Sequence, residues 1–199
     1  MRWHKFISSV LHPVLMPTIG VLIYLILTDL RIDFYQKLSL VGIVAVSTYL
    51  IPILLLTVLK SINLIDSYHV KTIPERKFPV LFMIVLFFFV GKSLFEVSII
   101  RDVSYLFYGT CFGLVLVYLI FMINIKTSLH LLSMGSAVGF FIIFQYLQET
   151  SITPIILIFI LLSGILGSAR LSLKAHTPKE VYLGFIIGIL SQVIVYRFL

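Results

Sequence analysis

Long apolar stretches and short polar connections alternate along the whole sequence. Each apolar stretch is close to the roughly 20 residues that a helix needs to cross the hydrocarbon core of a bilayer. Because backbone polar groups in lipid must be hydrogen-bonded within their own segment, such stretches are expected to be helices. The pattern predicts an all-α fold, a polytopic transmembrane helical bundle of about six or seven spans. The seven stretches that can be drawn are Val10–Leu27, Leu38–Leu59, Pro79–Ile100, Tyr105–Asn124, Leu131–Leu147, Pro154–Leu171 and Val181–Phe198.

Several residues inside these stretches predict local features. Pro13 and Pro17 fall in the first stretch and no small-residue cleavage site follows it, so we interpret it as a retained span and not as a signal peptide. Pro52 is expected to kink the second span. Lys92 and Glu96 interrupt the third at helical i,i+4 spacing. They either snorkel toward an interface or mark a polar position inside the bundle.

Glycine spacing predicts how two of the helices pack. Gly135 and Gly139 form a GxxxG pattern in the fifth stretch, and Gly184 and Gly188 form another in the seventh. Such spacing lets helix backbones approach each other closely. The sequence shows no internal repeat and no long linker, so we expect a single transmembrane domain over residues 1–199.

Composition excludes an ordinary soluble domain. Of the 199 residues, 60% are hydrophobic and 12% are charged, whereas soluble proteins are about half apolar and a quarter charged. The net charge of +7 is concentrated in short connections. Membrane orientation, anionic lipid headgroups or an anionic substrate explain it better than a nucleic acid does. The only cysteine, Cys111, is expected to be a small buried hydrophobe. The oligomeric state is left open.

Polar residues gather in three connections, residues 66–79, 126–130 and 168–180. Each follows an even-numbered stretch, so with seven spans all three share one membrane face with the N-terminus. Most of the lysine and arginine residues belong to that face, and the positive-inside rule then favours the cytoplasm. The residues gathered there are Lys71, Arg76, Lys77, Lys126, His130, Arg170, Lys174, His176 and Glu180.

This set of side chains suits phosphate chemistry. Cations bind phosphate oxygens and neutralise the charge that develops in the transition state. One histidine can attack phosphorus, and a second can protonate the leaving oxygen and then activate water. Glu180, four residues after His176, can accept the Nδ1–H of that histidine and hold its tautomer. No metal-ligand spacing is present in the sequence, so metal-independent chemistry without a cofactor is expected.

Three short segments resemble a known family. Arg170-x5-His176-x3-Glu180 resembles the third signature of the type 2 phosphatidic acid phosphatase family, Ser-Arg-x5-His-x3-Asp. Residues 127–130, Thr-Ser-Leu-His, resemble the second signature, Pro-Ser-Gly-His, and residues 71–79 resemble the first, Lys-x6-Arg-Pro. The order of the segments and their side of the membrane also agree.

The resemblance implies a role for each matching residue. His176 is the expected nucleophile, which carries a transient phosphohistidine, and Glu180 orients it in place of the family's Asp. His130 is the expected general acid and then the base for water. Phe78 stands where the family has Arg, so Arg76 or Lys77 must supply that cation. The expected phosphate-binding residues are Arg170, Lys71, Ser128 and Arg76. The other departures are Thr127 for Pro, Leu129 for Gly and Ala169 for Ser.

Glu180 also has a purely structural explanation. Thr177 suits a helix N-cap, Pro178 the first helical position, and Glu180 the third position of a capping box. The two explanations are compatible, because a helix that starts there would hold Glu180 beside His176.

The sequence thus favours a membrane-embedded lipid phosphate phosphatase, a metal-independent phosphoric monoester or diphosphate hydrolase. Its expected partners are a lipid phosphate substrate and membrane lipids, and its expected location is the bacterial inner membrane, as a multi-pass protein. The alternatives are a catalytically degenerate relative that binds anionic lipid, and a small membrane transporter. The choice of lipid phosphate and the membrane face of the site stay open.

Overall fold

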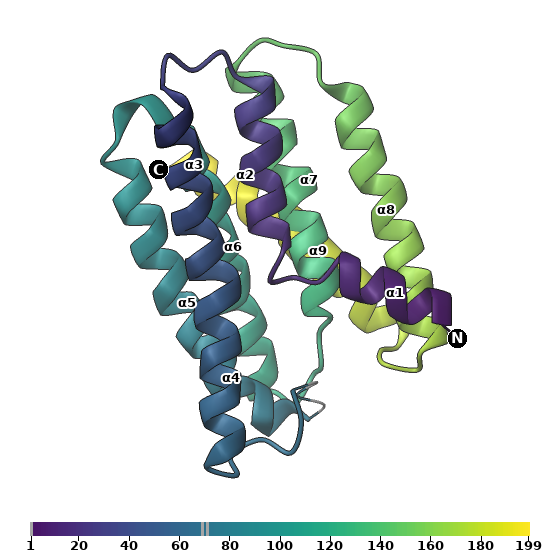
Figure 1. Ribbon diagram of the computed structural model, residues 1–199. Coiled ribbons are helices and arrows are strands. Elements are labelled where there is room, and N and C mark those ends of the chain that lie inside the picture. Colours follow the sequence, from purple (N-terminus) through teal and green to yellow (C-terminus); the bar gives the residue numbers. More distant parts are fainter. Residues whose placement is uncertain (1, 69, 71) are drawn as a thin grey trace.

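The computed structural model describes residues 2–68, 70 and 72–199, and every regular element in these residues is a helix, which confirms the predicted all-α class (Figure 1). The elements are α1 (Arg2–Val10), α2 (Met16–Leu27), α3 (Phe34–Ala45), the π-helical turn η1 (Val46–Leu50), α4 (Ile51–Ser61), α5 (Ile73–Phe95), the 3-10 turn η2 (Ser98–Ile100), α6 (Arg101–Met122), α7 (Leu129–Leu147), α8 (Thr153–Ser172) and α9 (Pro178–Phe198).

Six helical segments of the described chain are long and apolar enough to cross a membrane. The first predicted span, Val10–Leu27, is wrong as a single helix, because α1 ends at Val10 and α2 begins at Met16. Pro13 explains the break, since proline lacks an N–H and disfavours helical backbone in the residue before it. With 12 residues, α2 is about 18 Å long, which is short for a hydrocarbon core of about 30 Å.

The N-terminal helix α1 is amphipathic and lies crosswise to the long helices, near the C-terminal end of α8 (Figure 1). Ile7 and Ser8 face the protein and are buried, and α1 packs against α8. Trp3, Phe6 and Val10 are exposed. A short helix with an exposed apolar face beside basic residues is typical of the membrane interface.

The second predicted span is one continuous helical segment, Phe34–Ser61, in which η1 separates α3 from α4. Pro52 lies two residues beyond the end of η1. Its ring crowds the carbonyl of Thr48 and it has no N–H to donate, so the helix widens by one residue at this point. Lys92 and Glu96 are both exposed at the C-terminal end of α5, as expected for interface positions and not for a polar position inside the bundle.

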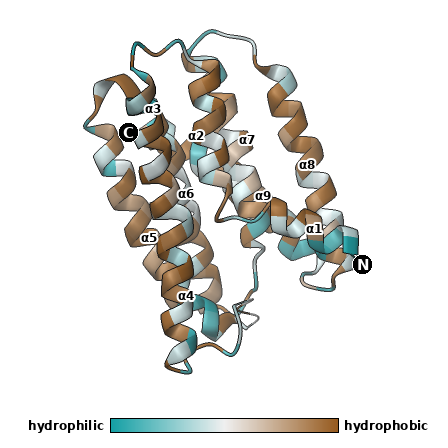
Figure 2. Cartoon of the chain, in the orientation of Figure 1, coloured by the Kyte–Doolittle hydropathy of each residue, from teal (hydrophilic) through white to brown (hydrophobic). Residues whose placement is uncertain are grey.

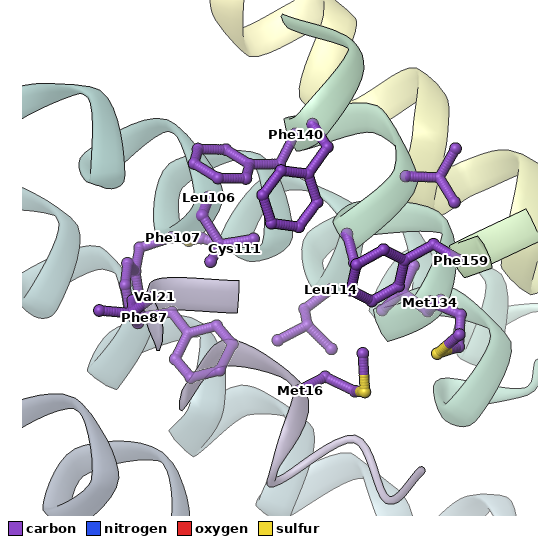
Figure 3. Packing of buried hydrophobic residues seen from close by; sticks show 14 of the residues in the cluster. Met16, Val21, Phe87, Leu106, Phe107, Cys111, Leu114, Met134, Phe140 and Phe159 are labelled. Carbon is purple, nitrogen blue, oxygen red and sulfur yellow. The ribbon is translucent and has the colours of Figure 1, made fainter. Parts of the chain in front are cut away.

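The core is organised around α7, the most buried of the six candidate spans. Figure 2 shows hydrophobic residues along the long helices and hydrophilic residues near their ends and on α1. Figure 3 shows apolar side chains of α2, α5, α6, α7 and α8 meeting in the interior, and Phe141 of α7 stacks on Phe159 of α8 with ring centroids 5.3 Å apart. The labelled residues are Met16, Val21, Phe87, Leu106, Phe107, Cys111, Leu114, Met134, Phe140 and Phe159.

Glycine brings the backbones of α7 and α9 into direct contact. A Cβ atom added to Gly135 would collide with the carbonyl oxygen of Phe185, and one added to Gly188 would collide with that of Leu132. A Cβ atom on Gly184 would collide with the Ser128 carbonyl. The close packing predicted from the two GxxxG patterns is therefore confirmed, and it joins the beginning of α7 to the beginning of α9.

Candidate active site

The three polar connections lie at one end of the bundle, together with α1 (Figure 1). Residues 62–72 precede α5, residues 123–128 precede α7, and residues 173–177 join α8 to α9. The Ser128 N–H donates to the carbonyl oxygen of Glu180 at 3.1 Å, so the second and third connections are also tied by a backbone hydrogen bond. The polar connections therefore lie together at one end of the bundle, as the sequence predicted.

His176 and Glu180 form a short hydrogen bond, 2.6 Å between Nδ1 and Oε2. A carboxylate can only accept, so Nδ1 carries the proton and the neutral ring keeps a lone pair on Nε2. Burial lowers the pKa of His176 to about 4, and the hydrogen bond with Glu180 opposes this shift. Nearby positive charges contribute to the same lowering; they belong to Arg76, Arg170 and Lys126. His176 is thus neutral at physiological pH.

The start of α9 accounts for the position of Glu180. Thr177 is the N-cap of α9, and its Oγ1 accepts from the Glu180 N–H at 3.4 Å. The Glu180 carboxylate is directed to His176. The helix start is the predicted one, but the Glu180 side chain contacts His176, so of the capping box only the contact made by the Thr177 side chain is seen.

His130 lies in the first turn of α7, and Ser128 is the N-cap of that helix. Nε2 of His130 is 3.2 Å from the carbonyl oxygen of Ser8 and 3.4 Å from the Ser8 hydroxyl. Its ring meets that of His12 edge to face, with centroids 5.0 Å apart. Both Ser8 and His12 come from the N-terminal region, outside the three polar connections predicted to form the site.

Two arginines from different helices complete the cationic part of the site. Arg170, in the last turn of α8, donates from Nη1 to the Ser8 hydroxyl at 2.8 Å. Arg76, in the first turn of α5, donates from Nε to the Val70 carbonyl at 2.8 Å and from Nη1 to the Thr127 carbonyl at 3.3 Å. Arg76 is buried, whereas Lys77 is only half-buried, so Arg76 is the cation that the first segment brings to the site.

One predicted phosphate-binding residue, Ser128, does not line the site, and another lies outside the described residues. Ser128 is fully buried, and its hydroxyl accepts from the Leu131 N–H at 3.4 Å as the N-cap of α7. Lys71 lies outside the described residues. Lys126, which belongs to the predicted polar cluster but not to the expected phosphate-binding residues, donates from Nζ to the Ala175 carbonyl at 3.1 Å, beside His176. Burial lowers the pKa of Lys126, and the charge of Arg76 adds to this effect.

A cavity of about 200 Å³ opens at this cluster and continues into the bundle. At one end it is lined by Arg76, His130, Arg170 and His176. Most of its other walls are apolar side chains of α2, α4, α5, α6 and α7, among them Met16, Phe87, Leu106 and Leu114, which Figure 3 labels. A charged opening above an apolar interior suits a ligand with an anionic head and a hydrocarbon tail. Among the described residues, no group of three or more His, Cys, Asp or Glu side chains is arranged to hold a metal ion.

The fold and this site define a helical, multi-pass membrane protein with a histidine–carboxylate pair and an arginine cluster at the opening of an apolar cavity. Residues 124–199 match the family model of the PAP2 superfamily. This segment is therefore related to the type 2 phosphatidic acid phosphatase family, and the relationship supports phosphatase activity on phosphate esters. The matched part contains His130, Arg170, His176 and Glu180. No curated protein and no solved structure matches the chain.

Proposed function

We propose that the protein is a lipid phosphate phosphatase that removes phosphate from a phosphomonoester or diphosphate of a membrane lipid. The observation that carries this proposal is the joining of the His176–Glu180 pair and two arginines to one cavity with mostly apolar walls. Such a cavity accommodates the start of a hydrocarbon tail while the phosphate stays at the membrane interface. The expected setting is an inner bacterial membrane, with the acyl or prenyl part of the substrate in the bundle.

In the first step of the proposed mechanism, Nε2 of His176 attacks the phosphorus atom. The P–N bond forms as the P–O bond to the lipid breaks. His130, in its protonated form, gives its proton to the leaving oxygen, so the lipid departs as an alcohol or as a shorter phosphate. Arg170 and Arg76 neutralise the charge on the phosphoryl oxygens in the transition state.

In the second step, His130 is neutral and accepts a proton from a water molecule. The water oxygen attacks phosphorus, the P–N bond breaks, and inorganic phosphate leaves. His176 regains its lone pair, and His130 regains the proton that it needs for the next turnover. Glu180 accepts the Nδ1–H throughout and stabilises the positive charge that the phosphorylated ring carries.

The test is phosphate release from a panel of lipid phosphates in detergent, with EDTA present. The panel holds phosphatidic acid, phosphatidylglycerophosphate, undecaprenyl diphosphate and lipid A phosphates. We expect release by the wild type, and its loss in His176→Ala and His130→Ala. His4→Ala, on α1, is the matched control and should keep full activity. Release from no lipid, or release that survives His176→Ala, contradicts the mechanism.

A second candidate is a relative of the family that binds anionic lipid without turnover. The full burial of Ser128 favours this candidate, because the site then lacks one predicted phosphate contact. The same panel separates the two functions. Binding of lipid phosphates that is saturable and requires Arg170, without release of phosphate from any of them, supports the binding protein.

A further inference from the structure

Ser8 of α1 contacts both a predicted phosphate-binding residue and the predicted general acid. Its hydroxyl accepts from Arg170 Nη1 at 2.8 Å and lies 3.4 Å from His130 Nε2. Its carbonyl oxygen lies 3.2 Å from the same Nε2 atom. These contacts join residues 122 and 162 positions apart in the chain. Ser8 is 8% exposed, so the contacts are made inside the protein.

We propose that Ser8 is a phosphate-binding residue, delivered to the site by the N-terminal helix. The inference rests on the proposed function and extends its site to a residue outside the segment that matches the family. A serine hydroxyl has one proton to donate and two lone pairs. When Arg170 donates to one lone pair, the hydroxyl proton is free to be donated to an oxygen of the bound phosphate.

The need for such a hydroxyl follows from the position of Ser128. That residue was the hydroxyl expected at the site, but it is fully buried and caps α7. Ala169, beside Arg170, has no hydroxyl to offer. Ser8 is therefore the hydroxyl that lies within hydrogen-bonding distance of both Arg170 and His130 among the contacts of the described residues.

The packing of α1 explains how Ser8 is held in place. Ile7 is buried next to it in the sequence, and Leu11, one turn further on, is buried as well. Both belong to the main apolar core, so α1 is anchored to the bundle on the side that carries Ser8. Ser9, the next residue, is exposed. Two neighbouring serines on one helix thus differ in their access to the site.

A competing interpretation is that Ser8 blocks the site. The atoms that it engages, Arg170 Nη1 and His130 Nε2, are ones that a phosphate group would use. If Ser8 had to leave before phosphate entered, removing its hydroxyl would strengthen phosphate binding. The two interpretations therefore predict opposite signs for the same substitution.

The experiment uses the full-length protein in detergent and measures the affinity for inorganic phosphate by calorimetry, for wild type, Ser8→Ala, Ser8→Thr and Ser9→Ala. We expect Ser8→Ala to weaken phosphate binding by about tenfold, the usual size of one hydrogen bond to a charged group. Ser8→Thr, which keeps a hydroxyl, should stay within about threefold of the wild type. Ser9→Ala should match the wild type, and thermal unfolding should show that each variant is folded.

Equal affinity of Ser8→Ala and wild type overturns the proposal, as does tighter binding by Ser8→Ala, which marks Ser8 as a blocking residue. Lack of measurable binding to the wild type, or a loss in Ser8→Thr as large as in Ser8→Ala, overturns it too. Failure of the proposed function has a different signature. In that case phosphate binds in a manner that depends on Ser8, while no lipid in the panel releases phosphate.

Discussion

Nδ1 of His176 and Oε2 of Glu180 lie 2.6 Å apart across one turn at the start of α9. This contact fixes the tautomer of the histidine and leaves Nε2 as the atom with a free lone pair. It also places the carboxylate where it stabilises a positive ring after phosphorylation. The pair is therefore the part of the site whose chemistry is most directly testable.

Glu180→Gln tests the pair. The amide oxygen of glutamine can still accept from Nδ1–H, but the negative charge is lost, so the phosphorylated ring is less stabilised. We expect kcat to fall by about a hundredfold with little change in KM. Glu149→Gln, at the opposite end of the bundle, is the matched control and should leave both constants unchanged. An unaltered kcat in Glu180→Gln would show that turnover does not need the negative charge of Glu180.

The protonation of His176 gives a prediction in the absence of substrate. Because burial and the neighbouring cations lower its pKa to about 4, the ring should stay neutral from pH 8 down to pH 5. NMR of protein with nitrogen-15 histidines can follow the titration, with His176→Gln to assign the signal. Glu180→Gln should lower the pKa further, because the hydrogen bond with Glu180 raises it. A midpoint near the usual value of about 6.5 would contradict the burial of this ring.

Arg76→Lys tests the cation that the first segment brings to the site. Lysine keeps the charge but lacks the planar fork that bonds the Val70 and Thr127 carbonyls, so the charge should no longer be held at the cavity. We expect KM for a lipid phosphate to rise by about tenfold. Lys77→Gln, one residue further on, should leave KM unchanged. A larger effect at Lys77 than at Arg76 would reverse this assignment.

Gly135→Ala tests the backbone contact between α7 and α9. The new Cβ would meet the Phe185 carbonyl, a backbone atom that cannot rotate away, so unfolding should become easier by about 1–3 kcal/mol. Gly164→Ala is the control, because no atom lies within 4 Å of a Cβ placed there. Alanine should be neutral or slightly stabilising at Gly164, since it favours helix over glycine. Thermal unfolding in detergent measures both, and equal effects would contradict the tight contact.

The membrane face of the site can be found by labelling engineered cysteines. Ser172→Cys is at the last residue of α8, beside the site, and Ser151→Cys is in the connection between α7 and α8, at the other end of α8; both positions are exposed. The native Cys111 is buried, so it should contribute little background. From the excess of basic residues at the site end, we expect an impermeant thiol reagent on intact cells to label Ser151→Cys but not Ser172→Cys. The reverse pattern would place the site on the outer face.

Periodicity and spacing identified what depends on neighbours along the chain. Six of the seven predicted apolar stretches correspond to the six segments of the described chain that can cross a membrane. The GxxxG patterns predicted where α7 meets α9. The His176–Glu180 pair followed from its i,i+4 spacing, since one helix start holds both residues in fixed relation. The first stretch was predicted wrongly, because hydropathy alone does not register that Pro13 ends a helix.

Tertiary structure decided what depends on residues far apart in the chain. Arg76 rather than Lys77 faces the cavity because helical rotation and packing bury only one of two adjacent cations. Ser128 caps the start of α7, where its hydroxyl accepts from a backbone N–H that has no partner within the helix. It is fully buried there, so a ligand cannot reach it. Ser8 reached Arg170 only because α1 packs against α8, which no local pattern encodes. The sequence by itself therefore determined the helices and the chemistry available, and the packing of distant helices decided which side chains share the site.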